Sequence, residues 1–388
     1  MALILTRSPY LISDQGFTNA VMTLGIQEYD FESYPTSLKT YTLTFRTQEY
    51  IDISPLVRDY LIDRDIVKVS IVINGTPSGY YTASHYAVDG YGYYEEGMNK
   101  DFSSELYNNG LYAGSNNVIQ RYTNKALDIP LLNPMVSSAG YDISENATNT
   151  LINFYKGSEL LRTKTTNFGY FSTPLIQLTT ADRIQYITES TYDTFEERVE
   201  EDGGTYETNS CIEAFLKEFP DEYAYYPATR VEIVPQSDYN RAYNLTVQKI
   251  DECKYTPHRI RFTNKLGVKE NLWFFKRSNE SISTEKESFR ANTFNDYVSG
   301  DLSKHVYRNY NLNGKESMTL NTGFVPESFK ENFKQLMLSE KVWLDKDGVD
   351  LPINIKNSEL QLKKSVNDKL INYTIDIEFS YDKINNIF

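Results

Sequence analysis

The sequence predicts a mainly β protein, α+β at the C-terminal end, with two β-sandwich or barrel-like domains and a few short helices. Three observations support this. Apolar and polar residues alternate with a period of two in several segments, turn signals such as Asn74-Gly75 close apolar runs, and the chain contains 32 tyrosines and 20 phenylalanines. Aromatic and β-branched side chains suit the half-buried surface of a sheet.

The length of 388 residues is enough for two domains that each bury a core. We predict an N-terminal β domain over residues 1–195, with loops rich in Tyr, Gly and Asn, and a C-terminal β domain over residues 205–388. Between them, the acidic, glycine-bearing stretch of residues 195–204 has the composition of a solvated linker or hairpin tip.

Composition limits the partners of the chain. The formal charge is −14, from 39 basic and 53 acidic residues, and basic residues are not concentrated anywhere, which argues against sequence-specific nucleic-acid binding. No stretch approaches the roughly 20 apolar residues of a membrane span, and the N-terminus lacks the basic head of a secretory signal. Cys211 and Cys253 show no metal-ligand spacing, so reduced thiols are expected and a disulfide stays open.

The N-terminal part is predicted as strands with one short helix. Residues 41–45 alternate, and residues 66–73 form a Val/Ile-rich run that Asn74-Gly75 closes with a turn. Residues 54–61 should be helical, with Ser54 as cap and proline at the first helical position. Further strands are predicted at residues 151–155 and 183–189.

Residues 75–120 are rich in Gly, Tyr, Asn and Ser, a composition that favours long excursions from a sheet. Tyrosine is enriched where protein surfaces meet and on sugar-binding faces, although the excess equally suits a β-rich fold. We therefore take the tyrosines of this region as candidate partner-contact residues: Tyr80, Tyr81, Tyr86, Tyr91, Tyr93, Tyr94, Tyr107 and Tyr112.

The C-terminal half shows clearer patterns. Residues 259–262 and 272–275 flank a turn at residues 264–267 and predict a hairpin. Apolar residues spaced at helical intervals predict an amphipathic helix near residues 326–339, packed on the second sheet. From residue 370 the period changes to two, with Ile371, Tyr373, Ile375, Ile377, Phe379 and Tyr381 on one face.

Residues 340–356 raise the question of a metal site. Asp345, Asp347 and Asp350 are spaced like ligands, but the calcium-binding loop has its glycine sixth and a glutamate twelfth, whereas here glycine is fourth and position twelve is Lys356. A hairpin explains the stretch better, with Gly348 supplying a positive φ at the turn. Pro352 then predicts that the returning strand is an edge or bulged strand.

The sequence predicts no catalytic residue, cofactor or metal. The acidic run at residues 196–202 is typical of a solvated face, because catalytic carboxylates must face each other across a cleft. His85, His258 and His305 are isolated, and no hydrolase, zinc or phosphate-loop motif occurs. The protein is therefore not expected to be an enzyme.

Several phrases of the chain together resemble a known group of proteins. They are ECKYTPHRIRFTNKLGVKENLWFFKRS at residues 252–278, GKESMTLNTGFVPESFKENFKQLMLSEKVWL at 314–344, NDKLINYTIDIEFSYDKINNI at 367–387, and SPYLIS and IDISPLVRDYL near the N-terminus. They resemble virion and tail-associated proteins of tailed bacteriophages that infect Bacteroidota, including the crAss-like short-tailed phages. The similarity is weak from about residue 75 to 210, and it brings no catalytic residues to transfer.

The resemblance implies a structural subunit of the phage particle, present in multiple copies as a ring or connector protein of the neck or tail. Its expected partners are itself and other tail or neck proteins, in a virion assembled in the host cytoplasm. An acidic chain also suits a position around a DNA channel, since it avoids sticking to DNA. Two alternatives remain open, a tail module in which these tyrosines bind host-surface glycans and, with less support, an enzyme that degrades a surface polymer.

Overall fold

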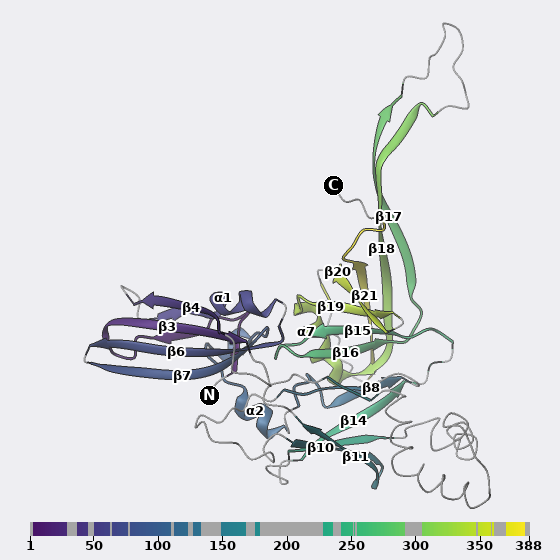
Figure 1. The fold of residues 1–388 in the computed structure, drawn as a ribbon. Coiled ribbons are helices and arrows are strands. Elements are labelled where there is room, and N and C mark those ends of the chain that lie inside the picture. Colours follow the sequence, from purple (N-terminus) through teal and green to yellow (C-terminus); the bar gives the residue numbers. More distant parts are fainter. Residues whose placement is uncertain are drawn as a thin grey trace, which may run out of the picture. The chain divides into compact units, whose positions relative to one another are not determined.

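The computed structural model describes residues 3–28, 37–45, 50–122, 127–132, 149–167, 175–178, 228–235, 242–291, 305–360 and 370–384, apart from residues 63, 77, 110, 111, 251, 253, 347 and 358 (Figure 1). In this part of the chain strands predominate over short helices, and the strands form several separate sheets. The predicted mainly β, sandwich-like fold is confirmed.

The chain divides into two compact units. The first unit comprises Met1–Asp251, Phe262–Asn271 and Glu331–Ser339, and the second comprises Glu252–Arg261, Leu272–Lys330 and Glu340–Phe388. The predicted boundary near residues 195–205 lies outside the described residues. The two later segments of the first unit come from the half of the chain that the sequence assigns to the C-terminal domain.

The first sheet belongs to the first unit and has five strands in the order β1-β7-β6-β3-β4, with β1 parallel to β7. Their bounds are β1 Leu3–Leu5, β3 Thr18–Glu28, β4 Ser37–Thr44, β6 Ile66–Thr76 and β7 Gly79–Val88. Alternate residues of β3 and β6 face the same core, and Met22 lies opposite Ile73 and Leu24 opposite Ile71. The predicted strands at 41–45 and 66–73 belong to this sheet.

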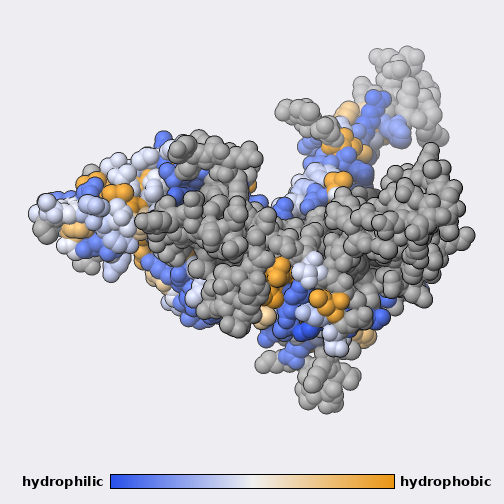
Figure 2. Space-filling view, turned by 60° about the horizontal axis from the view of Figure 1, so that its bottom comes forward, coloured by the Kyte–Doolittle hydropathy of each residue, from blue (hydrophilic) through white to orange (hydrophobic). Residues whose placement is uncertain are grey.

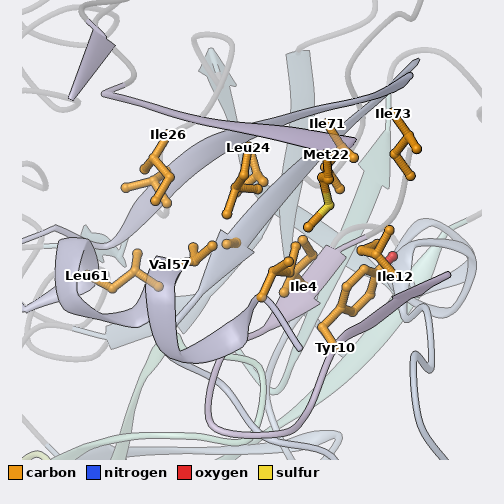
Figure 3. Close-up of a cluster of buried hydrophobic side chains, with 14 of the residues drawn as sticks. Ile4, Tyr10, Ile12, Met22, Leu24, Ile26, Val57, Leu61, Ile71 and Ile73 are labelled. Atoms are coloured by element: carbon orange, nitrogen blue, oxygen red, sulfur yellow. The ribbon is translucent and has the colours of Figure 1, made fainter. Parts of the chain in front are cut away.

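A second layer covers one face of this sheet (Figure 3). It consists of the short paired strands β2 (Leu11–Ser13) and β5 (Tyr50–Asp52), the helix α1 (Ser54–Arg58) and the 3₁₀ turn η1 (Asp59–Leu61). Ile12, Val57 and Leu61 from this layer pack against the buried residues of β3 and β6. The burial of apolar area from two layers stabilises the unit.

Two local predictions in this region are corrected. Ser54 does not cap the helix; instead Asp52 Oδ1 accepts both the Ser54 N–H (3.0 Å) and the Ser54 hydroxyl (2.6 Å). Asn74-Gly75 does not form the turn, because both residues continue β6 and pair with Tyr80 and Gly79.

The prediction that residues 75–120 are mainly excursions is wrong for β7, which lies between β6 and β1 and ends in three buried residues. On the other face of the first sheet, Leu3, Tyr86 and Val88 pack against Phe102 and against Leu106 of helix α2 (Ser103–Asn108). This end of the first sheet is therefore covered on both faces, and β7 is an interior strand because it pairs with both β1 and β6.

The first unit contains a second sheet of five strands, in the order β11-β10-β13-β14-β8. Their bounds are β8 Val118–Tyr122, β10 Asn149–Lys156, β11 Glu159–Asn167, β13 Arg230–Pro235 and β14 Tyr243–Ile250; β9 (Leu127–Pro130) pairs with β12 (Leu175–Leu178). Ile152, Phe154, Val231 and Leu245 are among its core residues. The predicted strand at 151–155 is β10, whereas the one at 183–189 lies outside the described residues.

The third sheet has seven strands in the order β16-β15-β19-β20-β21-β18-β17. Their bounds are β15 His258–Thr263, β16 Lys269–Phe274, β17 Asn279–Arg290, β18 Tyr307–Pro326, β19 Val342–Lys346, β20 Val349–Ile355 and β21 Leu370–Phe379. The two predicted hairpins are present as β15–β16 and β19–β20, and Gly348 has the expected positive φ of 85°. In β21 the predicted apolar face is buried from Ile371 to Phe379, and Tyr381 lies beyond it, exposed.

Pro352 does not mark an edge strand. β20 pairs with β19 on one side and with β21 on the other. The ladder with β21 ends where the Pro352 carbonyl accepts the Ser380 N–H at 3.0 Å. Since the N–H and C=O of one strand residue point toward the same neighbour, the missing proline N–H falls at the end of the ladder, where it interrupts no central hydrogen bond.

The predicted helix near residues 326–339 is present as the 3₁₀ turn η5 (Glu327–Phe329) followed by α7 (Lys330–Leu338). The helix was predicted to belong to the C-terminal domain, but residues 331–339 belong to the first unit. The physical reason is a set of polar contacts from α7 to loops of the first unit, described below.

Candidate assembly surfaces

The predicted contact tyrosines divide into two groups. Tyr86, Tyr91 and Tyr112 are buried, so they are not part of an exposed contact surface. Tyr86 is in the core beside β1, and the Tyr112 hydroxyl donates to the Asn116 carbonyl at 2.6 Å. Burial raises the pKa of Tyr112 well above its ordinary value. Composition alone did not separate core tyrosines from surface tyrosines.

Four of the other tyrosines are at least partly accessible. Tyr80 and Tyr81 of β7 are exposed, Tyr94 is fully exposed, and Tyr93 is half-buried. The side chain of Tyr107 lies outside the described residues. Figure 2 shows that hydrophobic residues gather in separate patches between hydrophilic ones on the visible face.

A pocket of about 510 Å³ lies beside the loop of residues 91–102. We call it the loop pocket; it is lined by Leu5, Ser8, Pro9, Tyr10, Gly92, Tyr93, Tyr94, Gly97, Met98, Asn99, Lys100 and Phe102. Tyr94 and Met98 are 100% and 67% exposed. The volume falls within the range of about 300–1,000 Å³ that is common for ligand pockets.

The loop is held to the rest of the first unit at several points. Asn99 accepts the Leu11 N–H at 2.8 Å and donates to the Leu11 carbonyl at 2.6 Å, as a neighbouring strand would. Asp101 accepts the Leu3 N–H at 3.2 Å. Asn99 has a φ of 55°, in the left-handed region that asparagine tolerates better than most residues. The pocket wall is therefore preformed.

Tyr93 is clamped between two later segments of the chain. Its hydroxyl donates to Glu331 Oε1 of α7 at 2.5 Å. The Nζ atoms of Lys334 and Lys265 lie 3.5 Å and 4.5 Å from its ring centroid, at cation–π distance. Burial and then the hydrogen bond to Glu331 raise the pKa of Tyr93 far above its ordinary value. We call these contacts the clamp; they fix the loop at Tyr93, whereas the next residue, Tyr94, is fully exposed.

Tyr91 is anchored in the same way. The Arg7 guanidinium lies 4.8 Å from its ring centroid, and Arg7 Nη2 donates to the Leu338 carbonyl at the end of α7 at 2.7 Å. Burial raises the pKa of Tyr91 to about 12, although the Arg7 charge opposes this. Gln335 of α7 accepts the Lys265 N–H at 2.9 Å. These contacts explain why α7 belongs to the first unit.

Glu270 is the buried centre of this region. Its carboxylate accepts the Ser115 N–H and hydroxyl (2.7–3.1 Å), the Asn264 amide (3.0 Å) and the Asn332 amide (2.7 Å). Burial raises the pKa of Glu270, and the bonds from Ser115 and Asn264 oppose the shift. Three segments that are remote in sequence meet at one carboxylate. Glu270 does not line the loop pocket, so its arrangement is that of a structural anchor.

The hairpin β17–β18 in the second unit presents a different surface (Figure 1). β18 pairs with β21 from Ser317 to Pro326, while β17 continues to pair with β18 as far as Arg290 and Tyr307. We call residues 285–290 and 307–312 the outer hairpin. Every residue of β17 and the first six of β18 are exposed. Among the described strands, the outer hairpin is therefore a two-stranded ribbon with accessible side chains on both faces.

The outer hairpin exposes large apolar side chains. Phe289, Tyr307, Tyr310 and Leu312 are each about half exposed or more. The rings of Phe289 and Tyr310 form an edge-to-face pair with centroids 5.6 Å apart. A hydrogen bond to Glu287 raises the pKa of Tyr310. The sequence patterns predicted no role for this hairpin, although its aromatic residues stand out among polar ones.

Asp345 and Asp350, two of the aspartates weighed as metal ligands, form ion pairs with arginines. Arg259 pairs with Asp345, and Arg261 Nη1 donates to Asp350 at 2.6 Å. Burial acts to raise the pKa of Asp345, but its hydrogen bond from Arg259 and the arginine charge lower it overall. Arg259 also lies 5.5 Å from the Trp273 ring centroid. The alternation of arginines at 259 and 261 in an apolar strand was the signal for these pairs.

The remaining candidates show no converging site. Within the described residues, no group of three or more His, Cys, Asp or Glu side chains could hold a metal ion. His258 faces Ser278 at 3.2 Å and burial lowers its pKa, His85 contacts the Tyr10 ring edge, and His305 is exposed. The acidic run at 196–202, Asp347 and both cysteines lie outside the described residues. No helix in the described parts of the chain is long and apolar enough to cross a membrane.

The described residues therefore offer two prominent apolar surfaces, the loop pocket in the first unit and the outer hairpin in the second. Comparison of the chain with protein-family models, curated proteins and solved structures finds no match.

Proposed function

We propose that this protein is a structural subunit of a tailed bacteriophage particle, a multi-copy ring or connector of the neck or tail that acts by protein–protein assembly. The observation that carries the proposal is the outer hairpin. A two-stranded ribbon is at best marginally stable in water, and further strands or a covering surface are needed to hold it. Its exposed aromatic residues supply the contact area that a partner would cover.

Two features of the sequence support the same proposal. The phrases at residues 252–278, 314–344 and 367–387 resemble tail-associated phage proteins, and they include β15, β16, β21, α7 and parts of β18 and β19. The net charge of −14 disfavours adhesion to DNA, as a subunit around a DNA channel requires. We place the protein in the virion, assembled in the host cytoplasm, with itself and other tail or neck proteins as partners.

The experiment is the mass of the full chain in solution by light scattering, with negative-stain imaging of the same peak. The matched variant replaces residues 285–313 by Asn-Gly, which joins Thr284 to Gly314, a pair already opposite each other in the hairpin. The wild-type chain should form closed rings, and the shortened chain should be a folded monomer. A wild-type chain that stays monomeric at every concentration tested would contradict self-assembly through this hairpin.

A second candidate function is binding of a host-surface glycan. The fully exposed Tyr94 at the preformed loop pocket favours it, because sugars stack on accessible aromatic faces. Tyr91 and Tyr93 are anchored to Arg7 and Glu331, so their replacement would disturb the loop itself. Tyr94→Ala is therefore the clean test on a glycan array. Loss of binding in this variant would support the candidate, and absence of binding by the wild-type chain would reject it.

A further inference from the structure

We propose that the outer hairpin of one copy docks into the loop pocket of a second copy of this chain. The inference rests on the proposed function, because it names the surfaces through which copies would join. It starts from symmetry. A ring needs a heterologous interface, in which two different patches of the same chain fit each other. Among the residues that the structure describes, the outer hairpin is a projecting apolar patch on the second unit and the loop pocket is a concave one on the first.

The two surfaces are complementary in shape and chemistry. The outer hairpin offers the Phe289–Tyr310 ring pair, and the loop pocket offers about 510 Å³ lined by Leu5, Tyr10, Phe102 and other residues. Its wall is fixed by the Asn99 and Tyr93 contacts, so little conformational entropy is lost when a side chain enters. Exposed Tyr94 and Met98 supply further apolar contact area.

Charge favours the same pairing. The outer hairpin carries three basic residues, Lys286, Arg290 and Arg308, against two acidic ones, Glu285 and Glu287. Residues 91–105 carry four acidic residues, Glu95, Glu96, Asp101 and Glu105, against one basic residue, Lys100. Glu105 and Glu96 pair with Lys100 and Lys265, which leaves this loop negative. In a chain of net charge −14, a hairpin with a basic excess meets a loop with an acidic excess.

The test uses two full-length variants, each with one damaged surface. The hairpin variant is Phe289→Ser with Tyr310→Ser, and the pocket variant is Tyr94→Ser with Met98→Ser. Phe289 and Tyr310 are about half exposed, and Tyr94 and Met98 are mostly exposed, so both variants should remain folded. The matched control is Tyr80→Ser, which replaces an exposed tyrosine at the start of β7 and should assemble like the wild-type chain.

Light scattering gives the decisive readout. Each variant alone should be a monomer, and an equal mixture should form a dimer of one hairpin variant and one pocket variant, because one intact hairpin then meets one intact pocket. If the pocket variant assembles like the wild-type chain, or if the mixture stays monomeric, the docking is overturned while the assembly function stands. A wild-type chain that does not assemble overturns the proposed assembly, and the docking with it.

Discussion

The loop of residues 91–102 and the outer hairpin contain similar residues in opposite settings. In the loop, Tyr93 contacts Glu331 and Lys334 of α7 and Lys265 of the β15–β16 turn, and the Tyr91 ring lies beside Arg7. In the outer hairpin, Phe289 and Tyr310 contact each other and remain exposed. The first arrangement is complete within one chain, whereas the second gains stability when another surface covers it.

This contrast shows that aromatic content does not by itself mark a contact surface. The two regions differ in whether charged groups of the same chain contact the aromatic side chains. A tyrosine with a hydrogen-bonded hydroxyl and cations on its ring is part of the scaffold. A neighbour without burial, such as Tyr94, is available for binding.

Glu270→Ala should be the most destabilising change. It leaves the buried donors of Ser115, Asn264 and Asn332 without their acceptor, and we expect a loss of about 3 kcal/mol or more in the free energy of unfolding. Urea unfolding measures it. The control is Glu105→Ala, an exposed glutamate that should change the value by less than about 0.5 kcal/mol. Equal effects would mean that the carboxylate is not the anchor of this region.

Tyr93→Phe should have an intermediate effect. The variant keeps the ring between the two lysines and removes the hydrogen bond to the Glu331 carboxylate, which is worth about 1.5–3 kcal/mol for a charged partner. Tyr94→Phe is the matched control, since its side chain is fully exposed and should leave the urea midpoint unchanged. A Tyr93→Phe chain as stable as the wild type would show that the clamp does not hold the loop.

The stability contributed by Glu270 should depend on pH with a defined sign. Its folded pKa is raised above the ordinary 4.5, so the folded chain binds this proton more tightly than the unfolded chain. The unfolding free energy of the wild type, relative to Glu270→Gln, should therefore be highest below about pH 4.5 and should fall as pH rises toward the folded pKa. Urea unfolding of both chains across this range measures the difference; one that grows with pH would contradict the raised pKa.

Phe289→Ser should have the smallest effect on stability. Its side chain is exposed on the outer hairpin, so the unfolding free energy of the isolated chain should change by less than about 1 kcal/mol. Phe274→Ser, a fully buried phenylalanine of β16, is the contrasting variant and should cost about 3–5 kcal/mol. Similar losses for the two variants would show that the outer hairpin is packed within the chain after all.

Local patterns predicted elements that have one buried and one exposed face. β21 is the clearest case, because burial on one side and water on the other impose a period of two. The hairpins β15–β16 and β19–β20 followed from turn residues between apolar runs. β7 was missed because its first two tyrosines, Tyr80 and Tyr81, are consecutive and both exposed. The strand therefore begins without the alternation of buried and exposed residues that would point to the buried Tyr86.

The anchoring contacts could not be predicted for a different reason. Glu270 looks like an ordinary polar residue of a hairpin strand, and its donors come from positions as far apart as Ser115 and Asn332. The choice between a buried carboxylate and an exposed one depends on which distant donors the fold brings to it. For the same reason, the sequence argued against a metal at Asp345 but could not name Arg259 as its partner.

The late position of α7 bears on how the protein is synthesised. Tyr93 and its partner Glu331 are 238 residues apart, so the ribosome completes most of the chain before this loop can be fixed. Contacts of such high sequence separation form slowly. Domains that need only their own N-terminal residues fold as they emerge, but the loop of residues 91–102 gains its contacts to α7 only after residues 331–339 have been made. A nascent or prematurely terminated chain thus lacks a finished loop pocket, so the loop pocket would be complete only on full-length copies.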